Sequence, residues 1–151
     1  MFKKILIPTD GSTLATNAAQ AGVEFAKQCQ AEVVGVFVAP DYHYPIGVEI
    51  IPPSYPTEEE YKASIARTGE AYLEGVRKAA TESGLKYSSV IVYSEQTAQK
   101  VVEIAQQQQC DLIFIGSHGR SGLGQLLLGS VTSKVLALCD IPVFVYRMKK
   151  A

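Results

Sequence analysis

Residues 3–12 read Lys-Lys-Ile-Leu-Ile-Pro-Thr-Asp-Gly-Ser, and this stretch decides the fold. Its apolar run, Ile5-Leu6-Ile7, predicts a short buried strand over about residues 3–9. Asp10-Gly11-Ser12 is a turn signal that ends the strand. Apolar residues then recur at helical spacing and predict a helix whose inward face carries Leu14, Ala18, Ala21, Phe25 and Cys29. A strand, a tight turn and a helix in this order form the first half of a βαβ unit.

The alternation of strand and helix signals continues along the chain. Further strands are predicted at residues 33–38, 87–93, 111–115 and 141–146, and further helices begin near Thr57, Thr97 and Ser130. Thr57 forms a capping box with Glu60, and we expect Thr97 to cap the next helix. Five strands alternating with four helices predict a parallel sheet with helices on both faces. Polar residues in 87–93 and Pro142 in the last strand place these two strands at the edges.

Length and composition exclude several classes of protein. The chain has 151 residues, of which 47% are hydrophobic and 19% charged, so we expect a single domain over residues 1–151 and exclude disordered and fibrous proteins. A net charge of −1 gives no electrostatic footprint for nucleic acid. The longest apolar run, Val33–Ala39, is too short to span a membrane, so no membrane association is expected. Three scattered cysteines, Cys29, Cys110 and Cys139, are typical of reduced thiols in the cytoplasm.

Residues 40–57 depart from this alternation. They contain five of the seven prolines and the tyrosines Tyr42, Tyr44 and Tyr55. A loop of this length is uncommon in a compact domain, and it is typically a lid, a binding loop or a mobile segment. The sequence leaves these three interpretations open.

The motif that carries chemistry follows the fourth strand and reads Gly116-Ser117-His118-Gly119, nine residues, then Gly129-Ser130. Gly116 lets the backbone pass close to a ligand, and we expect Gly119 to adopt a positive φ so that amide groups point inward. The helix that begins near Ser130 offers unpaired N–H groups and the positive end of its dipole, which favour phosphate. The motif lacks the lysine of a Walker A loop and the third glycine of a dinucleotide fingerprint. It therefore predicts a phosphate-binding loop of another kind.

These residues resemble the universal stress protein family. The resemblance covers essentially the whole chain, from residues 5–12 to the final strand, and Gly116, Gly119, Gly129 and Ser130 match the Gly-x2-Gly-x9-Gly-Ser/Thr pattern of its ATP-binding branch. The resemblance implies an α/β fold with an open five-stranded parallel sheet of order 3-2-1-4-5, Rossmann-like and similar to the adenine nucleotide alpha hydrolases. It also implies a homodimer paired through the fifth strand, Pro142–Tyr146.

The resemblance further implies a nucleotide site. Its residues are Pro8, Thr9, Asp10, Val38, Ile115, Gly116, Gly119, Arg120, Gly129, Ser130 and Val131. Val38 would meet the adenine, and the residues from Gly129 to Val131 would hold the phosphate tail. Asp10 would lie near the ribose or a magnesium ion, although Asp-Gly-Ser is also ordinary turn chemistry. Ser130 can likewise be read as a helix N-cap only.

The implied function is that of a cytoplasmic, dimeric regulator of a stress response that binds ATP, with magnesium. No residue is a convincing general base, so we expect at most slow ATP hydrolysis or autophosphorylation, for instance at Ser121 or Ser130. Two alternatives stay open: an interaction module of the same fold with an empty crevice, and an adenylylating enzyme of the related superfamily. The enzyme would use a Ser-Gly-Gly-x-Asp-Ser type of loop after the first strand, which Thr9-Asp10-Gly11-Ser12 does not match.

Overall fold

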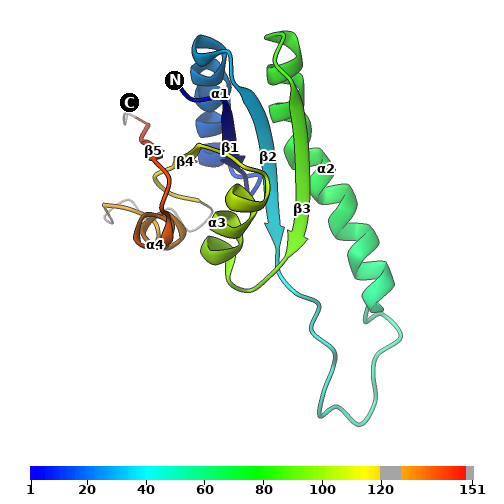
Figure 1. The fold of residues 1–151 in the computed structure, drawn as a ribbon. Helices are drawn as coiled ribbons and strands as arrows, with labels where there is room; N and C mark the ends of the chain where they lie inside the picture. Colours follow the sequence, from blue (N-terminus) through cyan, green and yellow to red (C-terminus); the bar gives the residue numbers. More distant parts are fainter. Residues whose placement is uncertain (120–126, 149–151) are drawn as a thin grey trace.

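The computed structural model describes residues 1–119 and 127–148, which form a parallel sheet between two layers of helices (Figure 1). The strands are β1 (Lys4–Pro8), β2 (Glu32–Ala39), β3 (Tyr87–Tyr93), β4 (Leu112–Gly116) and β5 (Val143–Tyr146). The helices are α1 (Thr13–Cys29), α2 (Glu58–Glu82), α3 (Thr97–Gln107) and α4 (Ser130–Leu138). No helix among the described residues is long and apolar enough to cross a membrane.

The sheet has the order β3-β2-β1-β4-β5, and every neighbouring pair is parallel. The order 3-2-1-4-5 expected from the family resemblance is confirmed, as are the edge positions of β3 and β5. The chain leaves β1 toward β2 on one side, whereas β4 lies on the other side of β1. The strand order therefore reverses between β1 and β4, and in an open α/β sheet this is where a crevice for ligands forms.

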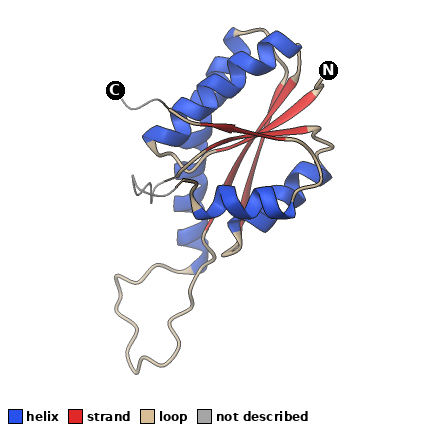
Figure 2. Ribbon diagram, turned by 90° about the vertical axis from the view of Figure 1, so that its left-hand side faces the viewer, coloured by secondary structure: helices blue, strands red, loops and turns tan. Residues whose placement is uncertain are grey.

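The core divides into two layers because alternate residues of each strand point to opposite faces of the sheet. On one face, Leu6 packs with α3 and α4 through residues such as Val101 and Val135. On the other face, Ile5 and Ile7 pack with α1 and α2. Figure 2 shows the helices on both sides of the sheet, so the central strands are buried on both faces.

The predicted inward face of α1 is confirmed except at Leu14, because Ala18 is buried and Ala21, Phe25 and Cys29 pack against the core. Leu14 is 37% exposed. The buried residues of α1 are Ala15, Ala18, Ala19, Gly22, Val23 and Ala26. Small residues allow the helix to lie close to the sheet, because a Cβ on Gly22 would come within 2.9 Å of the side chains of Ile7 and Phe114. Alanines and larger apolar residues form overlapping stripes on this helix, so periodicity alone did not show that Leu14 lies outside the buried face.

The helix starts are set by local capping. The Thr57–Glu60 capping box is confirmed, with the Thr57 hydroxyl accepting from the Glu60 N–H and the Glu60 carboxylate accepting from the Thr57 N–H. The prediction for Thr97 is wrong, because Gln96 is the N-cap of α3 and Thr97 is the first residue of that helix. Ser94 instead stabilises the turn, since its hydroxyl accepts the N–H of Gln96 at 3.0 Å.

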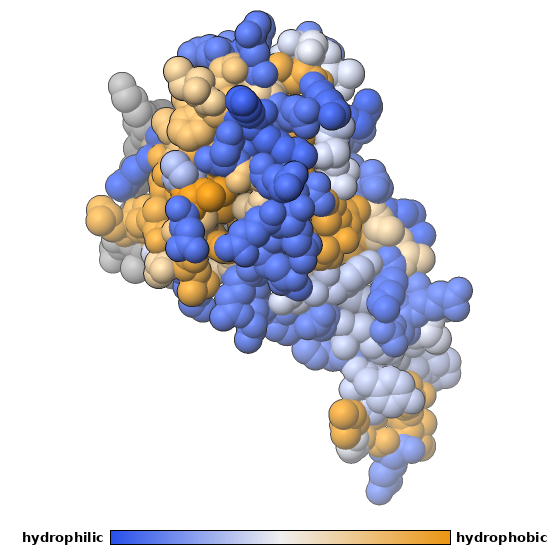
Figure 3. Space-filling view, viewed as in Figure 1, coloured by the Kyte–Doolittle hydropathy of each residue, from blue (hydrophilic) through white to orange (hydrophobic). Residues whose placement is uncertain are grey.

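Residues 40–57, here named the arm, contain no regular secondary structure and extend away from the sheet (Figures 1 and 2). Tyrosine hydroxyls hold its base together: Tyr42 donates to the carbonyl of Pro56 at 2.6 Å, and Tyr61 of α2 donates to that of Pro40. Apolar side chains collect at the tip, where Ile46 is 88% and Ile50 82% exposed (Figure 3). In this arrangement the arm does not cover the crevice.

Candidate functional site

A pocket of about 250 Å³ lies beyond the carboxyl ends of β1, β2 and β4, at the point where the strand order reverses. It is lined by Pro8, Thr9, Asp10, Ala15, Val36, Val38, Thr97, Val101, Ile115, Gly116, His118, Gly119, Gly129, Ser130, Val131 and Thr132. The structure thus brings together every predicted site residue that it describes, although they come from three separate parts of the chain. Arg120 and the candidate phosphorylation site Ser121 lie outside the described residues.

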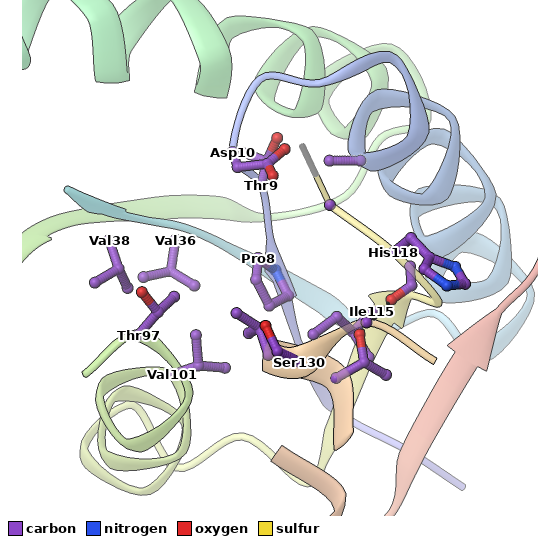
Figure 4. A pocket seen from close by; sticks show the side chains of 16 residues that line it. Pro8, Thr9, Asp10, Val36, Val38, Thr97, Val101, Ile115, His118 and Ser130 are labelled. Atoms are coloured by element: carbon purple, nitrogen blue, oxygen red, sulfur yellow. Dashed lines mark hydrogen bonds between the residues drawn. The ribbon is translucent and has the colours of Figure 1, made fainter. Parts of the chain in front are cut away.

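One end of the pocket is apolar. Val36 and Val38 of β2 and Thr97 and Val101 of α3 gather there, while Ile115 and His118 lie at the opposite end (Figure 4). Val36 and Val101 are fully or almost fully buried, so this end provides a dry surface for a flat apolar group.

The backbone of Val38 adds hydrogen-bonding groups to this apolar end. The ladder between β1 and β2 ends at the pair Pro8–Val36, and its last bond runs from the Thr9 N–H to the Val36 carbonyl at 2.9 Å. Val38 lies two residues further on, so its N–H and carbonyl face the same side of the strand as those of Val36. Within the described part of the chain, no β1 residue pairs with them. The N–H and the carbonyl of Val38 are therefore directed at a ligand in the apolar end of the pocket.

The turn after β1 holds the Asp10 carboxylate at the rim of the pocket. Oδ1 of Asp10 accepts the N–H of Ser12 at 3.0 Å, and the Ser12 hydroxyl accepts the N–H of Ala15 as the N-cap of α1. Gly11 has a φ of 75° and packs against the ring of Tyr72. Asp10 therefore stabilises this turn, as its Asp-Gly-Ser sequence predicts. The other oxygen of its carboxylate, Oδ2, is directed toward Gly119.

Gly119 is required for a reason other than the predicted one. Its φ is not in the left-handed region, so the expectation of a positive φ is wrong. A Cβ at this position would instead lie 2.5 Å from Oδ2 of Asp10. The glycine permits the close approach of two segments that are more than 100 residues apart in the sequence, a contact that the spacing of the motif could not reveal.

The two ends of the glycine-rich segment meet at the start of α4. The N–H of Gly129 donates to the Ser117 carbonyl at 2.7 Å, and the buried Thr132 hydroxyl donates to the Gly116 carbonyl at 2.7 Å. Gly129 is the N-cap of α4 and no described side chain caps the helix, so the reading of Ser130 as the N-cap is wrong. The first-turn N–H groups of α4 are consequently available to a ligand in the pocket.

The charges at the site are few. Asp10 is the only acidic residue among the described lining residues, and none of those residues is a lysine or an arginine. The described residues contain no group of three or more potential metal ligands. A magnesium ion that arrives with phosphates needs only one or two protein carboxylates, because phosphate oxygens and water complete its shell. The residues present fit such a phosphate-bound ion and do not form an independent metal centre.

Sequence reasoning missed several lining residues: Ala15, Val36, Thr97, Val101, His118 and Thr132. Periodicity offered a signal for some of them. Val36 lies two residues before the predicted Val38 and so shares its face of the strand, and Val101 lies one helical turn after Thr97. His118 also lines the pocket, and its Nδ1 lies 3.1 Å from the Ser117 hydroxyl oxygen.

The fold and the site together define a doubly wound α/β domain with a ligand crevice at its switch point, a class that includes many nucleotide-binding proteins. The universal stress protein family model matches residues 1–147. The chain is 33% identical over 150 residues to the universal stress protein MJ0531 of Methanocaldococcus jannaschii, which covers 99% of this chain and 85% of that protein. The chain therefore belongs to the universal stress protein family.

Solved structures show the same fold. The structure of MJ0577, also from Methanocaldococcus jannaschii, has a TM-score of 0.82 and 30% identity, and covers 100% of this chain and 99% of that one. A universal stress protein from Archaeoglobus fulgidus, solved in complex with dAMP, has a TM-score of 0.62 and 16% identity, with coverage of 95% and 96%. The second likeness bears on the fold alone.

Proposed function

We propose that this protein binds ATP, accompanied by magnesium, in the pocket at the switch point and acts as a nucleotide-dependent stress-response regulator. The observation that carries the proposal is the continuity of the pocket. An apolar end with unpaired backbone groups is joined directly to a helix N-terminus that no described side chain caps. A nucleotide has the same division into a flat base and a polyanionic tail.

The apolar end suits adenine. The base would lie between the valines of β2 and Val101 of α3, with the Val38 N–H and carbonyl facing its edge. Adenine presents an acceptor beside an amino donor on its Watson–Crick edge, which complements one backbone N–H and one backbone carbonyl. Guanine presents the opposite pattern, so the same two groups favour adenine over guanine.

The polar end suits ribose and phosphates. Asp10 would accept a hydrogen bond from a ribose hydroxyl or bind magnesium through its carboxylate, and Gly119 would keep the adjacent space open. The N–H groups of Ser130 and Val131 would receive phosphate oxygens at the positive end of the α4 dipole. The fold that this chain shares with the Archaeoglobus fulgidus protein, solved in complex with dAMP, is one that can accommodate an adenine nucleotide.

The proposed role is regulation in the cytoplasm with at most slow ATP hydrolysis. Efficient phosphoryl transfer needs a positioned base and strong charge stabilisation, and the described lining residues hold one carboxylate and no cationic side chain. We also propose a homodimer that pairs through Pro142–Tyr146. β5 is an edge strand, and its Phe144 side chain remains 42% exposed.

Calorimetric titration of the purified protein with ATP and GTP, each with magnesium, tests the nucleotide proposal. We expect saturable binding of ATP at one site per chain and GTP binding at least tenfold weaker. Because the chain has no tryptophan, an elevated 260/280 nm absorbance ratio would also reveal nucleotide retained through purification. A protein free of nucleotide that shows no heat with either ligand would refute the proposal.

A further inference from the structure

A second cavity adjoins the nucleotide pocket. It measures about 380 Å³ and is lined by Glu95, Gln96, Thr97, Ala98, Gln99, Ser130, Val131, Lys134 and Leu138. Thr97, Ser130 and Val131 line both cavities, so they form a shared border rather than a separating layer. A ligand tail that reaches Ser130 in the first cavity can therefore continue into the second.

Lys134 lines the second cavity beside this border. It is the only lysine or arginine among the described residues that line either cavity. It lies one helical turn after Ser130 and so on the same face of α4. Side chains on a helix lean toward its N-terminus, which directs the Lys134 chain back over Ser130.

No described carboxylate forms an ion pair with the Lys134 ammonium. Glu95 is the one carboxylate among the described residues that line the second cavity, and its Oε1 already accepts the Asp41 N–H at 3.0 Å and lies 3.1 Å from His43 Nε2. The charge of Lys134 is therefore available to an anion at the border of the two cavities.

We infer that Lys134 binds the terminal phosphates of the nucleotide and thereby sets the preference for a triphosphate over a monophosphate. The inference rests on the proposed nucleotide function. The first cavity has no cationic lining residue among those described, whereas each added phosphate brings negative charge. Lys134 lies one turn beyond Ser130, whose N–H we assign to the phosphates, so its ammonium should act mainly on the phosphate tail.

The test measures the dissociation constants of ATP, ADP and AMP for Lys134→Gln, Lys134→Arg and the wild type. Lys27→Gln removes an equal charge from the last turn of α1 and serves as the matched control. We expect Lys134→Gln to weaken ATP about tenfold and AMP less than twofold, and the difference from wild type to shrink at high salt. Lys134→Arg and Lys27→Gln should keep the wild-type ratio of ATP to AMP affinity.

The possible outcomes distinguish the role of Lys134 from the proposed nucleotide binding. Equal ATP/AMP ratios in wild type and Lys134→Gln would overturn the role of Lys134 while leaving nucleotide binding intact. An equal loss for AMP and ATP would also overturn it, because the effect would then come from a disturbed α4. A wild type that binds none of the three nucleotides would refute the proposed function itself.

Discussion

The contact between Gly119 and Asp10 gives the sharpest prediction of the structure. A Cβ on Gly119 would lie 2.5 Å from Asp10 Oδ2, and alanine can adopt the backbone of Gly119 because its φ is not in the left-handed region. The substitution Gly119→Ala therefore tests the contact alone. To reach ordinary van der Waals separation, the carboxylate must retreat by roughly 1 Å.

The cost of this retreat can be estimated in two parts. The carboxylate holds the Ser12 N–H at 3.0 Å through Oδ1, and losing that bond costs about 0.5–1.5 kcal/mol, which lowers Tm by only about 2–5 °C. If Asp10 binds the nucleotide as we propose, the same movement would also lengthen that contact by about 1 Å and break it. A lost hydrogen bond to a charged group costs about 1.5–3 kcal/mol, so ATP affinity should fall about 10- to 100-fold.

Calorimetry on a double-mutant cycle isolates the cause. In an Asp10→Ala background the carboxylate is gone, so Gly119→Ala should change the ATP dissociation constant by less than about twofold. Gly75→Ala, on an open part of α2, should leave ATP binding unchanged and serves as the control. If Gly119→Ala binds ATP as tightly as the wild type, or if its effect persists without Asp10, the steric reasoning is wrong.

Three further predictions concern stability. Gly11→Ala combines a φ of 75° with overlap of an aromatic ring, so thermal unfolding should show a loss of about 2–4 kcal/mol, whereas Gly75→Ala should be neutral or stabilising. Thr132→Val removes the 2.7 Å bond to the Gly116 carbonyl, and urea unfolding should report a loss of about 1–3 kcal/mol; no loss would mean that another donor satisfies that carbonyl. Burial raises the pKa of the Cys110 thiol from 9.0 to about 11, so the folded state holds this proton more tightly than the unfolded chain does. That contribution is complete below pH 9 and is lost as pH rises toward 11; between these values the wild type should lose about 2–3 kcal/mol more than Cys110→Ala, and equal slopes would contradict this.

Local signals in the sequence predicted the elements of the fold well. The apolar run at Ile5-Leu6-Ile7 and the capping box at Thr57 each depend on neighbours within a few residues, and both were confirmed. The exposure of Leu14 at the start of α1 was not predicted, because it depends on how the helix packs against the sheet. The cap assigned to Thr97 failed for a related reason, since Ser94 stabilises the turn before α3.

The glycine motif predicted the location of the candidate site but not its construction. Gly116, Gly119 and Gly129 all line the pocket, together with the residues after β1 that the family resemblance implied. Their spacing did not predict that Gly119 would be constrained by Asp10, nor that the N–H of Gly129 would close the loop on the Ser117 carbonyl.

The sequence by itself determined the order of strands and helices, the two-sided burial of the sheet and the membership of the family, because these depend on periodicity and on residues close together in the chain. Only the tertiary structure decided which groups share the pocket. The unpaired backbone of Val38, the side chains of Thr97 and Val101, and the charge of Lys134 come from segments far apart in the sequence. They meet because parallel strands end at the same edge of the sheet and the strand order reverses between β1 and β4, and such a meeting has no signature in any short stretch of the chain.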